Sequence, residues 1–201
     1  MFSTSFTQPG NSCGAATLAI AANQLGKQFQ GKPVMVDVPT VNGLFAKTSD
    51  PILSNALGKT NAQDYYSTPE KIMQVAKDLG LTVTLYEKTE LKTAVLPVDI
   101  TGFKTKYVDA FNPSSADTAT LKGLLTNKTY LQLLVYLDNV NTSMHWVLLQ
   151  TDGNGNYGLY DTAYGKNYPL NSTQVDSLLA FNASITTGRQ NNFYGIAILL
   201  Q

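Results

Sequence analysis

The segment 8-QPGNSCGAATLAIAANQLG-26 joins a polar loop, one cysteine and an Ala- and Leu-rich run that ends at a glycine. The run 14–25 has the composition of a buried or half-buried helix, and the glycine after it is a common C-terminal stop. Asn11 or Ser12 is expected to cap the first turn of this helix. The segment therefore predicts an apolar helix that carries Cys13 at its start.

Cys13 is the only cysteine of the chain, and its predicted position has chemical consequences. The free N–H groups and the dipole at a helix start stabilise negative charge, so this position favours the thiolate form of the side chain. The same N–H groups, above all that of Cys13, point to where an oxyanion would form. The side-chain amide of Gln8 is a candidate second donor to that oxyanion. A small buried side chain without chemical function is the alternative interpretation of Cys13.

The rest of the chain predicts an α+β domain. A second helix is expected at 69–79 and a strand at 81–87, whereas 31–66 shows little periodicity and is interpreted as loops with a short helix or two. Further helices are expected near 118–125 and 172–180, and further strands at 130–137, 145–151, 157–163 and 193–200. Helices concentrate early and antiparallel strands late, which is typical of an α+β fold, and residues 1–201 are expected to form one domain.

The only histidine of the chain, His145, opens one strand of a predicted hairpin, and Asp161 lies near the end of the other strand. A turn centred on Gly153 brings these two residues together at the open end of the hairpin. The carboxylate is then expected to accept the Nδ1–H of His145 and to hold Nε2 toward Cys13. Asp152 lies at the turn end of the hairpin and is the weaker candidate.

Composition excludes several classes of function. The chain has 14 basic and 14 acidic residues and no basic stripe, which argues against nucleic acid as the main partner. One Cys and one His are too few for a disulfide within the chain or a structural zinc site, so no metal or cofactor is expected. No stretch approaches the ~18 uninterrupted apolar residues of a membrane span, and no secretory signal opens the chain. We expect a soluble protein that is cytoplasmic or exported without a cleavable signal peptide.

These pieces resemble the papain-like cysteine peptidases, and most closely their C39-like branch, which includes bacteriocin-leader peptidases and stand-alone relatives. The resemblance implies a papain-like fold, in which an N-terminal helical part carries the nucleophile helix and packs on a C-terminal antiparallel β-sheet. The matching residues are Gln8, Cys13-Gly14-Ala15-Ala16, His145-Trp146-Val147 and Asp161-Thr162-Ala163-Tyr164-Gly165.

The resemblance also implies a role for each site residue. Cys13 would be the nucleophile, and His145 the general base and acid. Asp161 would orient the His145 ring, and Gln8 would donate to the oxyanion. Thr162 departs from the pattern, because relatives commonly carry Pro there.

No ABC-transporter portion is attached to this chain, so a stand-alone enzyme, or a bacterial toxin or effector, fits better than the leader peptidase of a transporter. The segment 27–115 matches no pattern that we can name.

Three functions remain open at this stage. The first is cleavage of a protein or peptide substrate by thiolate attack, and the second is glutamine deamidation or acyl transfer by the same Cys–His chemistry. The third is a non-catalytic papain-like module that binds a partner through the cleft where related enzymes bind their substrate. An inhibitory or immunity protein is a further candidate partner, and the sequence does not name the substrate.

Overall fold

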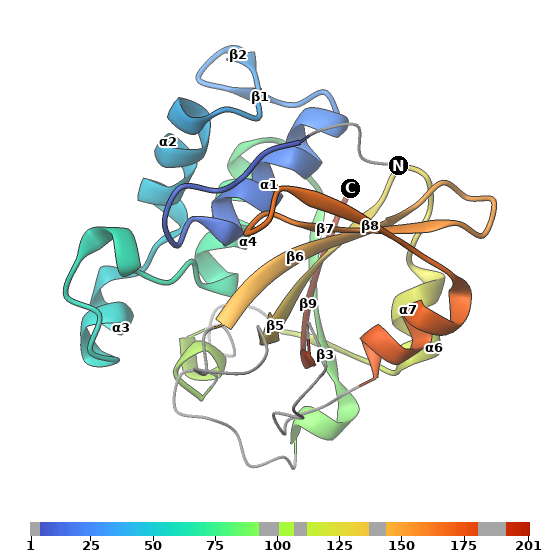
Figure 1. The fold of residues 1–201 in the computed structure, drawn as a ribbon. Coiled ribbons are helices and arrows are strands. Elements are labelled where there is room, and N and C mark those ends of the chain that lie inside the picture. The colour runs from blue at the N-terminus through green and yellow to red at the C-terminus, as the bar shows by residue number, and fades with distance from the viewer. Residues whose placement is uncertain (1–4, 93–100, 107–111, 137–143, 181–191) are drawn as a thin grey trace.

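A seven-stranded sheet lies at the centre of the computed structural model, which describes residues 5–92, 101–106, 112–136, 144–180 and 192–201 (Figure 1). The strand order is β4-β3-β9-β5-β6-β7-β8, and every neighbouring pair is antiparallel except β3 and β4. The strands are β3 (Val83–Lys88), β4 (Ser114–Ala116), β5 (Tyr130–Tyr136), β6 (Met144–Thr151), β7 (Tyr157–Asp161), β8 (Lys166–Leu170) and β9 (Asn192–Leu200). The predicted α+β class and the mainly antiparallel sheet are confirmed.

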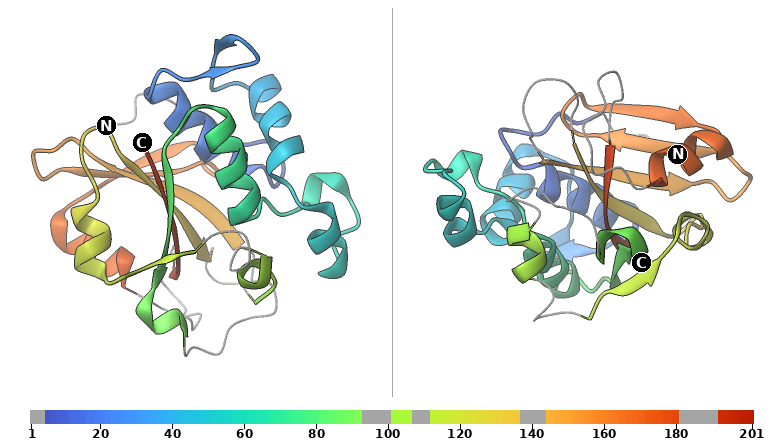
Figure 2. Two further views of the ribbon diagram at one scale, coloured as in Figure 1. Left: turned by 180° about the vertical axis from the view of Figure 1, so that it is seen from behind. Right: turned by 90° about the horizontal axis from the view of Figure 1, so that it is seen from below.

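Helices cover both faces of this sheet. Helices α1, α2 and α4 form a layer on one face, whereas α6 and α7 lie on the other (Figure 2). Their bounds are α1 (Cys13–Gln24), α2 (Val38–Thr48), α3 (Pro51–Ala56), α4 (Pro69–Asp78), α6 (Thr118–Gly123) and α7 (Ser172–Leu179); a small hairpin, β1 (Gln28–Phe29) and β2 (Lys32–Pro33), follows α1. None of the helices within the described ranges is long and apolar enough to cross a membrane.

The two helical layers explain why the central strands are apolar on both faces. Successive side chains of a strand point to opposite faces, so a sheet that is covered on both sides buries every position. In β9, Tyr194, Ile196 and Ile198 contribute to the core beneath α1 and α4. The intervening Ala197 and Leu199 contribute to the core beneath α6 and α7.

Helix α1 is buried along nearly its whole length, because its small Ala side chains allow close packing in the helical layer. The predicted helix is confirmed, and Gly26 follows it with φ +65°. The predicted side-chain cap is wrong. The Oγ of Ser12 donates to the carbonyl of Pro9 at 2.7 Å and caps no N–H group of the first turn, and Asn11 precedes the cap position.

The segment 31–66 contains more helix than its weak periodicity predicts. Helix α2 buries only a few side chains along its length, so its apolar pattern is faint. Its start signal is nevertheless clear, since Asp37 accepts a hydrogen bond from the N–H of Thr40 at 2.8 Å. Asp50 caps α3 in the same way, with 2.9 Å to the N–H of Leu53.

The turn of the late hairpin is centred one residue later than predicted. Its pairs run from Thr151 with Tyr157 to Leu148 with Tyr160, so the turn is centred on Asn154. Each residue of β6 therefore pairs with a residue of β7 that lies two positions later than predicted. A shift by two keeps every side chain on its predicted face of the sheet. The ladder stops before His145 and Asp161, and the two residues therefore meet diagonally beyond the last pair.

Candidate active site

Three elements bring Cys13, His145 and Asp161 together. Cys13 is the first residue of α1, His145 lies in β6, and Asp161 ends β7. The Nε2 of His145 lies 2.7 Å from Oδ1 of Asp161, and both side chains are only 2% exposed. The N–H of Ala163 donates to the same Oδ1 at 2.9 Å, which holds the carboxylate in place.

The imidazole of His145 is turned opposite to the predicted orientation. We expected Nδ1–H to face Asp161, but Nε2 makes that bond. Nδ1 is therefore the nitrogen that remains for Cys13, which lines the same cavity as His145. The pairing of His145 with Asp161 is as predicted, whereas the nitrogen that faces Asp161 is the other one.

The environment of His145 favours its charged form. Burial alone would lower the pKa of His145, because an apolar surrounding disfavours charge. The hydrogen bond to Asp161 and its negative charge, together with the interaction with Cys13, outweigh burial and raise the pKa of His145 to about 9. The raised pKa favours the imidazolium form at neutral pH, which carries a proton on both nitrogens.

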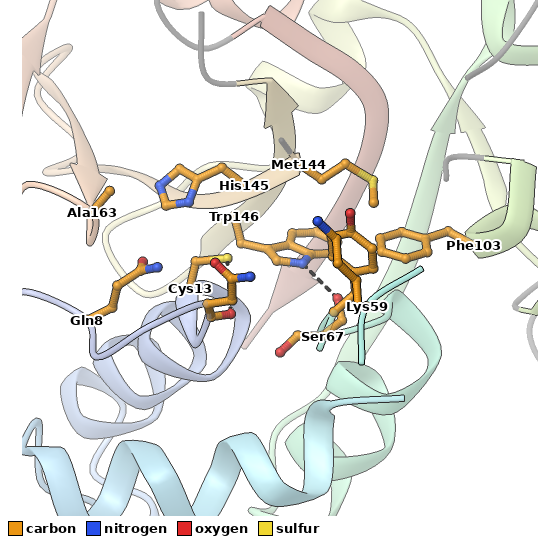
Figure 3. A pocket seen from close by; sticks show the side chains of 11 residues that line it. Gln8, Cys13, Lys59, Ser67, Phe103, Met144, His145, Trp146 and Ala163 are labelled. Atoms are coloured by element: carbon orange, nitrogen blue, oxygen red, sulfur yellow. Dashed lines mark hydrogen bonds between the residues drawn. The ribbon is translucent and has the colours of Figure 1, made fainter. Parts of the chain in front are cut away.

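Gln8 lies beside Cys13, on a segment that runs along the end of β7 (Figure 3). Its backbone N–H donates to the carbonyl of Thr162 at 2.9 Å. Its side-chain Oε1 accepts from the Thr162 hydroxyl at 2.5 Å, and its Nε2 donates to the carbonyl of Gly10 at 2.9 Å. An amide nitrogen carries two hydrogens, so one remains for a group in the pocket.

A cavity of about 250 Å³ opens in front of the sulfur, which belongs to a side chain that is 7% exposed. Figure 3 shows Gln8 on one side of Cys13, His145 above it, and Trp146 and Phe103 on the other side. The lining residues are Gln8, Asn11, Cys13, Lys59, Tyr66, Ser67, Phe103, Met144, His145, Trp146 and Ala163. The cavity therefore has a polar end at the sulfur and a largely apolar wall away from it.

The side of the cavity away from the sulfur includes residues for which the sequence indicated no role, and also Trp146, which the sequence offered only as part of the family resemblance. The Nε1 of Trp146 donates to the carbonyl of Ser67 at 2.9 Å. The ammonium of Lys59 lies 5.4 Å from the centre of the Tyr66 ring at the same cavity. Ser67, Lys59 and Tyr66 come from the segment without a recognisable pattern, and only their spatial position indicates a role.

The other carboxylate of the hairpin, Asp152, forms hydrogen bonds within the turn. Its Oδ1 accepts from the N–H of Asn154 at 2.8 Å, and its Oδ2 accepts from the side chain of Asn156 at 2.8 Å. Within the part of the chain that the structure describes, no three or more His, Cys, Asp or Glu side chains gather as metal ligands.

Comparison with known proteins relates this chain to cysteine peptidases. Residues 7–201 match the model of the family described as "Invasion plasmid antigen J, cysteine protease". Among solved structures, the chain is similar to the peptidase domain of Streptococcus ComA, a bi-functional ABC transporter involved in a quorum-sensing pathway. The two share 16% identity over 99% of this chain and 98% of that chain, with a TM-score of 0.50. No curated protein matches the sequence significantly. The fold is thus that of the papain-like, C39-like peptidases.

Proposed function

Since the chain belongs to the Invasion plasmid antigen J family of cysteine proteases, we propose that Cys13, His145, Asp161 and Gln8 together perform its peptide hydrolysis. Cys13 is the nucleophile, and His145 is the general acid and base. Asp161 orients the imidazole, and Gln8 donates to the oxyanion. The observation that carries this proposal is the buried 2.7 Å bond between His145 and Asp161, in a ring that lines the same cavity as Cys13.

The mechanism that we propose starts from a thiolate at Cys13 beside an imidazolium at His145. The raised pKa of His145 supports this state, because a charged ring beside the sulfur stabilises a negative charge there. The first-turn N–H groups of α1 add to this stabilisation, and Ser12 leaves them without a side-chain cap. The second bond of Asp161, to the N–H of Ala163, prevents the carboxylate from turning away from the ring.

Acylation begins when Sγ of Cys13 attacks the carbonyl carbon of the peptide bond. The carbonyl oxygen becomes an oxyanion, which accepts hydrogen bonds from the N–H of Cys13 and from Nε2 of Gln8. When the intermediate collapses, the C–N bond breaks and Nδ1–H of His145 protonates the leaving amine. The product of this half-reaction is a thioester on Cys13.

Deacylation reverses the roles of the ring. The neutral imidazole of His145 takes a proton from water, and the resulting hydroxide attacks the thioester carbonyl. The same two donors stabilise the second oxyanion. Collapse releases the carboxylic acid product and restores the thiolate and imidazolium pair.

The substrate of this reaction is a protein or peptide, and we infer that the enzyme acts as a bacterial effector or toxin. The name of the family, which refers to an invasion plasmid antigen, supports such a role. The apolar wall formed by Tyr66, Phe103, Met144 and Trp146 supports recognition of an apolar group next to the scissile bond.

A search for new N-termini in a cell lysate tests the proposal. The lysate is incubated with the wild type or with Cys13→Ala, and the N-terminal peptides are quantified by mass spectrometry. We expect new termini with the wild type alone, and their loss also in His145→Ala. New termini that appear equally with both proteins would contradict proteolysis by this site. Glutamine side chains converted with a gain of about one mass unit, without new termini, would indicate deamidation instead.

A further inference from the structure

The segment that carries Gln8 is attached to the end of β7 by several contacts. The hydroxyl of Tyr160 accepts from the N–H of Phe6 at 2.6 Å and donates to the carbonyl of Phe6 at 3.1 Å. Gly165 has φ +61°, and a Cβ there would lie 2.6 Å from the hydroxyl of Thr7. The backbone of Gln8 is therefore held in place by β7 and the turn after it.

The backbone contacts do not determine which way the Gln8 amide faces. Two hydrogen bonds determine the orientation of the amide. The Thr162 hydroxyl donates to Oε1 at 2.5 Å, and the Gly10 carbonyl accepts from Nε2 at 2.9 Å. A turn of the amide by 180° would bring Oε1 against the Gly10 oxygen, and two acceptors repel each other. The observed orientation leaves the second Nε2 hydrogen for the pocket.

Thr162 itself is well placed to hold the amide. It is 0% exposed and directly follows Asp161, so its backbone is fixed by the same turn that fixes the carboxylate. Its carbonyl binds the Gln8 N–H, and its hydroxyl binds the Gln8 side chain. Thr162 thus binds both the backbone and the side-chain amide of Gln8.

We propose that Thr162 is a positioning residue, whose hydroxyl orients the Gln8 amide so that Nε2 is ready to donate to the oxyanion. This inference rests on the proposed role of Gln8 as an oxyanion donor. Donors that are oriented before the reaction stabilise the transition state without a reorganisation cost. Without the hydroxyl only the Gly10 carbonyl restrains the amide, which then rotates more easily and spends part of its time with no donor directed at the oxyanion.

Two reagents distinguish an effect of Thr162 on the Gln8 amide from an effect on the reactivity of the Cys13 sulfur. p-Nitrophenyl acetate acylates a thiolate through a tetrahedral oxyanion: an S–C bond forms, a C–O bond breaks and p-nitrophenolate leaves with the electron pair. Iodoacetamide alkylates the thiolate by direct displacement of iodide, and no oxyanion forms on the reacting carbon. Both rates are measured on Cys13, with the modified residue verified by mass mapping.

Thr162→Val is the decisive variant, because it keeps the shape and the backbone carbonyl but removes the hydroxyl. We expect its acylation by p-nitrophenyl acetate to slow roughly tenfold while alkylation by iodoacetamide is unchanged. Thr162→Ser retains a hydroxyl and should restore acylation. Gln8→Ala should slow acylation about 100-fold, and the addition of Thr162→Val to it should have no further effect.

Three results would overturn the inference: unchanged acylation in Thr162→Val, an equal loss with both reagents, or the same loss in the Gln8→Ala background. If Thr162→Val does not fold, as judged by circular dichroism, Thr162→Ala also lacks the hydroxyl and takes its place with the same criteria. Failure of the proposed function is a different result, since neither reagent would then modify Cys13 of the wild type faster than an ordinary thiol.

Discussion

At the residue scale, His145 and its two neighbours determine the charge of the site. The chain contains one histidine and one cysteine, and the folded structure brings them to the same cavity. The identity of the pair could be predicted from the sequence, because no other residues of these types exist. The ring orientation could not, since it depends on side-chain rotation within a packed site rather than on position along a strand.

The single histidine allows a direct titration by NMR. We expect the imidazole of His145 to titrate near pH 9 in the wild type, and at least one unit lower in Asp161→Asn, where burial is opposed by fewer favourable bonds. The corresponding stability, about 3 kcal/mol, is fully present below pH 6.5, the pKa of an unperturbed imidazole, and is lost as pH rises through about 9. The direction follows because the folded state binds the proton more tightly than the unfolded state.

Asp152→Asn is the matched control for this titration. Asp152 lies at the other end of the same hairpin and titrates in the acidic range, because its hydrogen bonds to Asn156 and Asn154 lower its pKa. The His145 titration should be unchanged in this variant. An equal midpoint in the wild type and in Asp161→Asn would show that the carboxylate does not hold the charge of the ring.

At the element scale, the start of α1 requires a glycine after the nucleophile. A Cβ at Gly14 would lie 2.4 Å from Cβ of Ser67 and 3.0 Å from Cδ1 of Ile72. The helix could be predicted from its composition, and so could α4, which begins at Pro69 after its cap Thr68. The close approach to Ser67 could not, because these residues are remote along the chain.

Gly14→Ala should therefore destabilise the protein although Ala is the better helix former. We expect a loss of about 1–3 kcal/mol in the free energy of unfolding, because the added methyl group forces Ser67 away from α1. The matched control is Gly123→Ala in α6, where an added Cβ meets nothing within 4 Å. That variant should gain up to about 1 kcal/mol. Urea denaturation measures both, and an equal gain in the two variants would contradict the steric argument.

At the scale of the whole molecule, polar bonds connect the helical layer to the sheet beneath the site. The Nε2 of Gln132, a fully buried side chain of β5, donates to the carbonyl of Gly14 at 3.0 Å. Trp146 makes the comparable bond to Ser67. These bonds hold the start of α1 and the segment before α4 against the strands that carry His145.

The Gln132 bond contributes little net stability, and this can be tested. Its Oε1 is buried, and none of the described residues donates to it. Gln132→Leu gives up one hydrogen bond but also removes this unpaired oxygen, so the free energy of unfolding should change by less than about 1 kcal/mol. Gln132→Ala, which loses the same bond and leaves a cavity, should cost at least about 2 kcal/mol. Similar losses in both variants, measured by urea denaturation, would show that the bond itself is stabilising.

The α+β class and most helices and strands outside 31–66 could be predicted from the amino-acid sequence, which also supplied the four residues that we propose for the site. These follow from local properties: periodicity, turn residues and the single occurrence of Cys and His. Tertiary structure decided which nitrogen of His145 meets Asp161, how Thr162 contacts Gln8, and which residues from 27–115 line the cavity. The physical reason is that these features depend on the distance and orientation of side chains from separate elements, which local patterns do not encode.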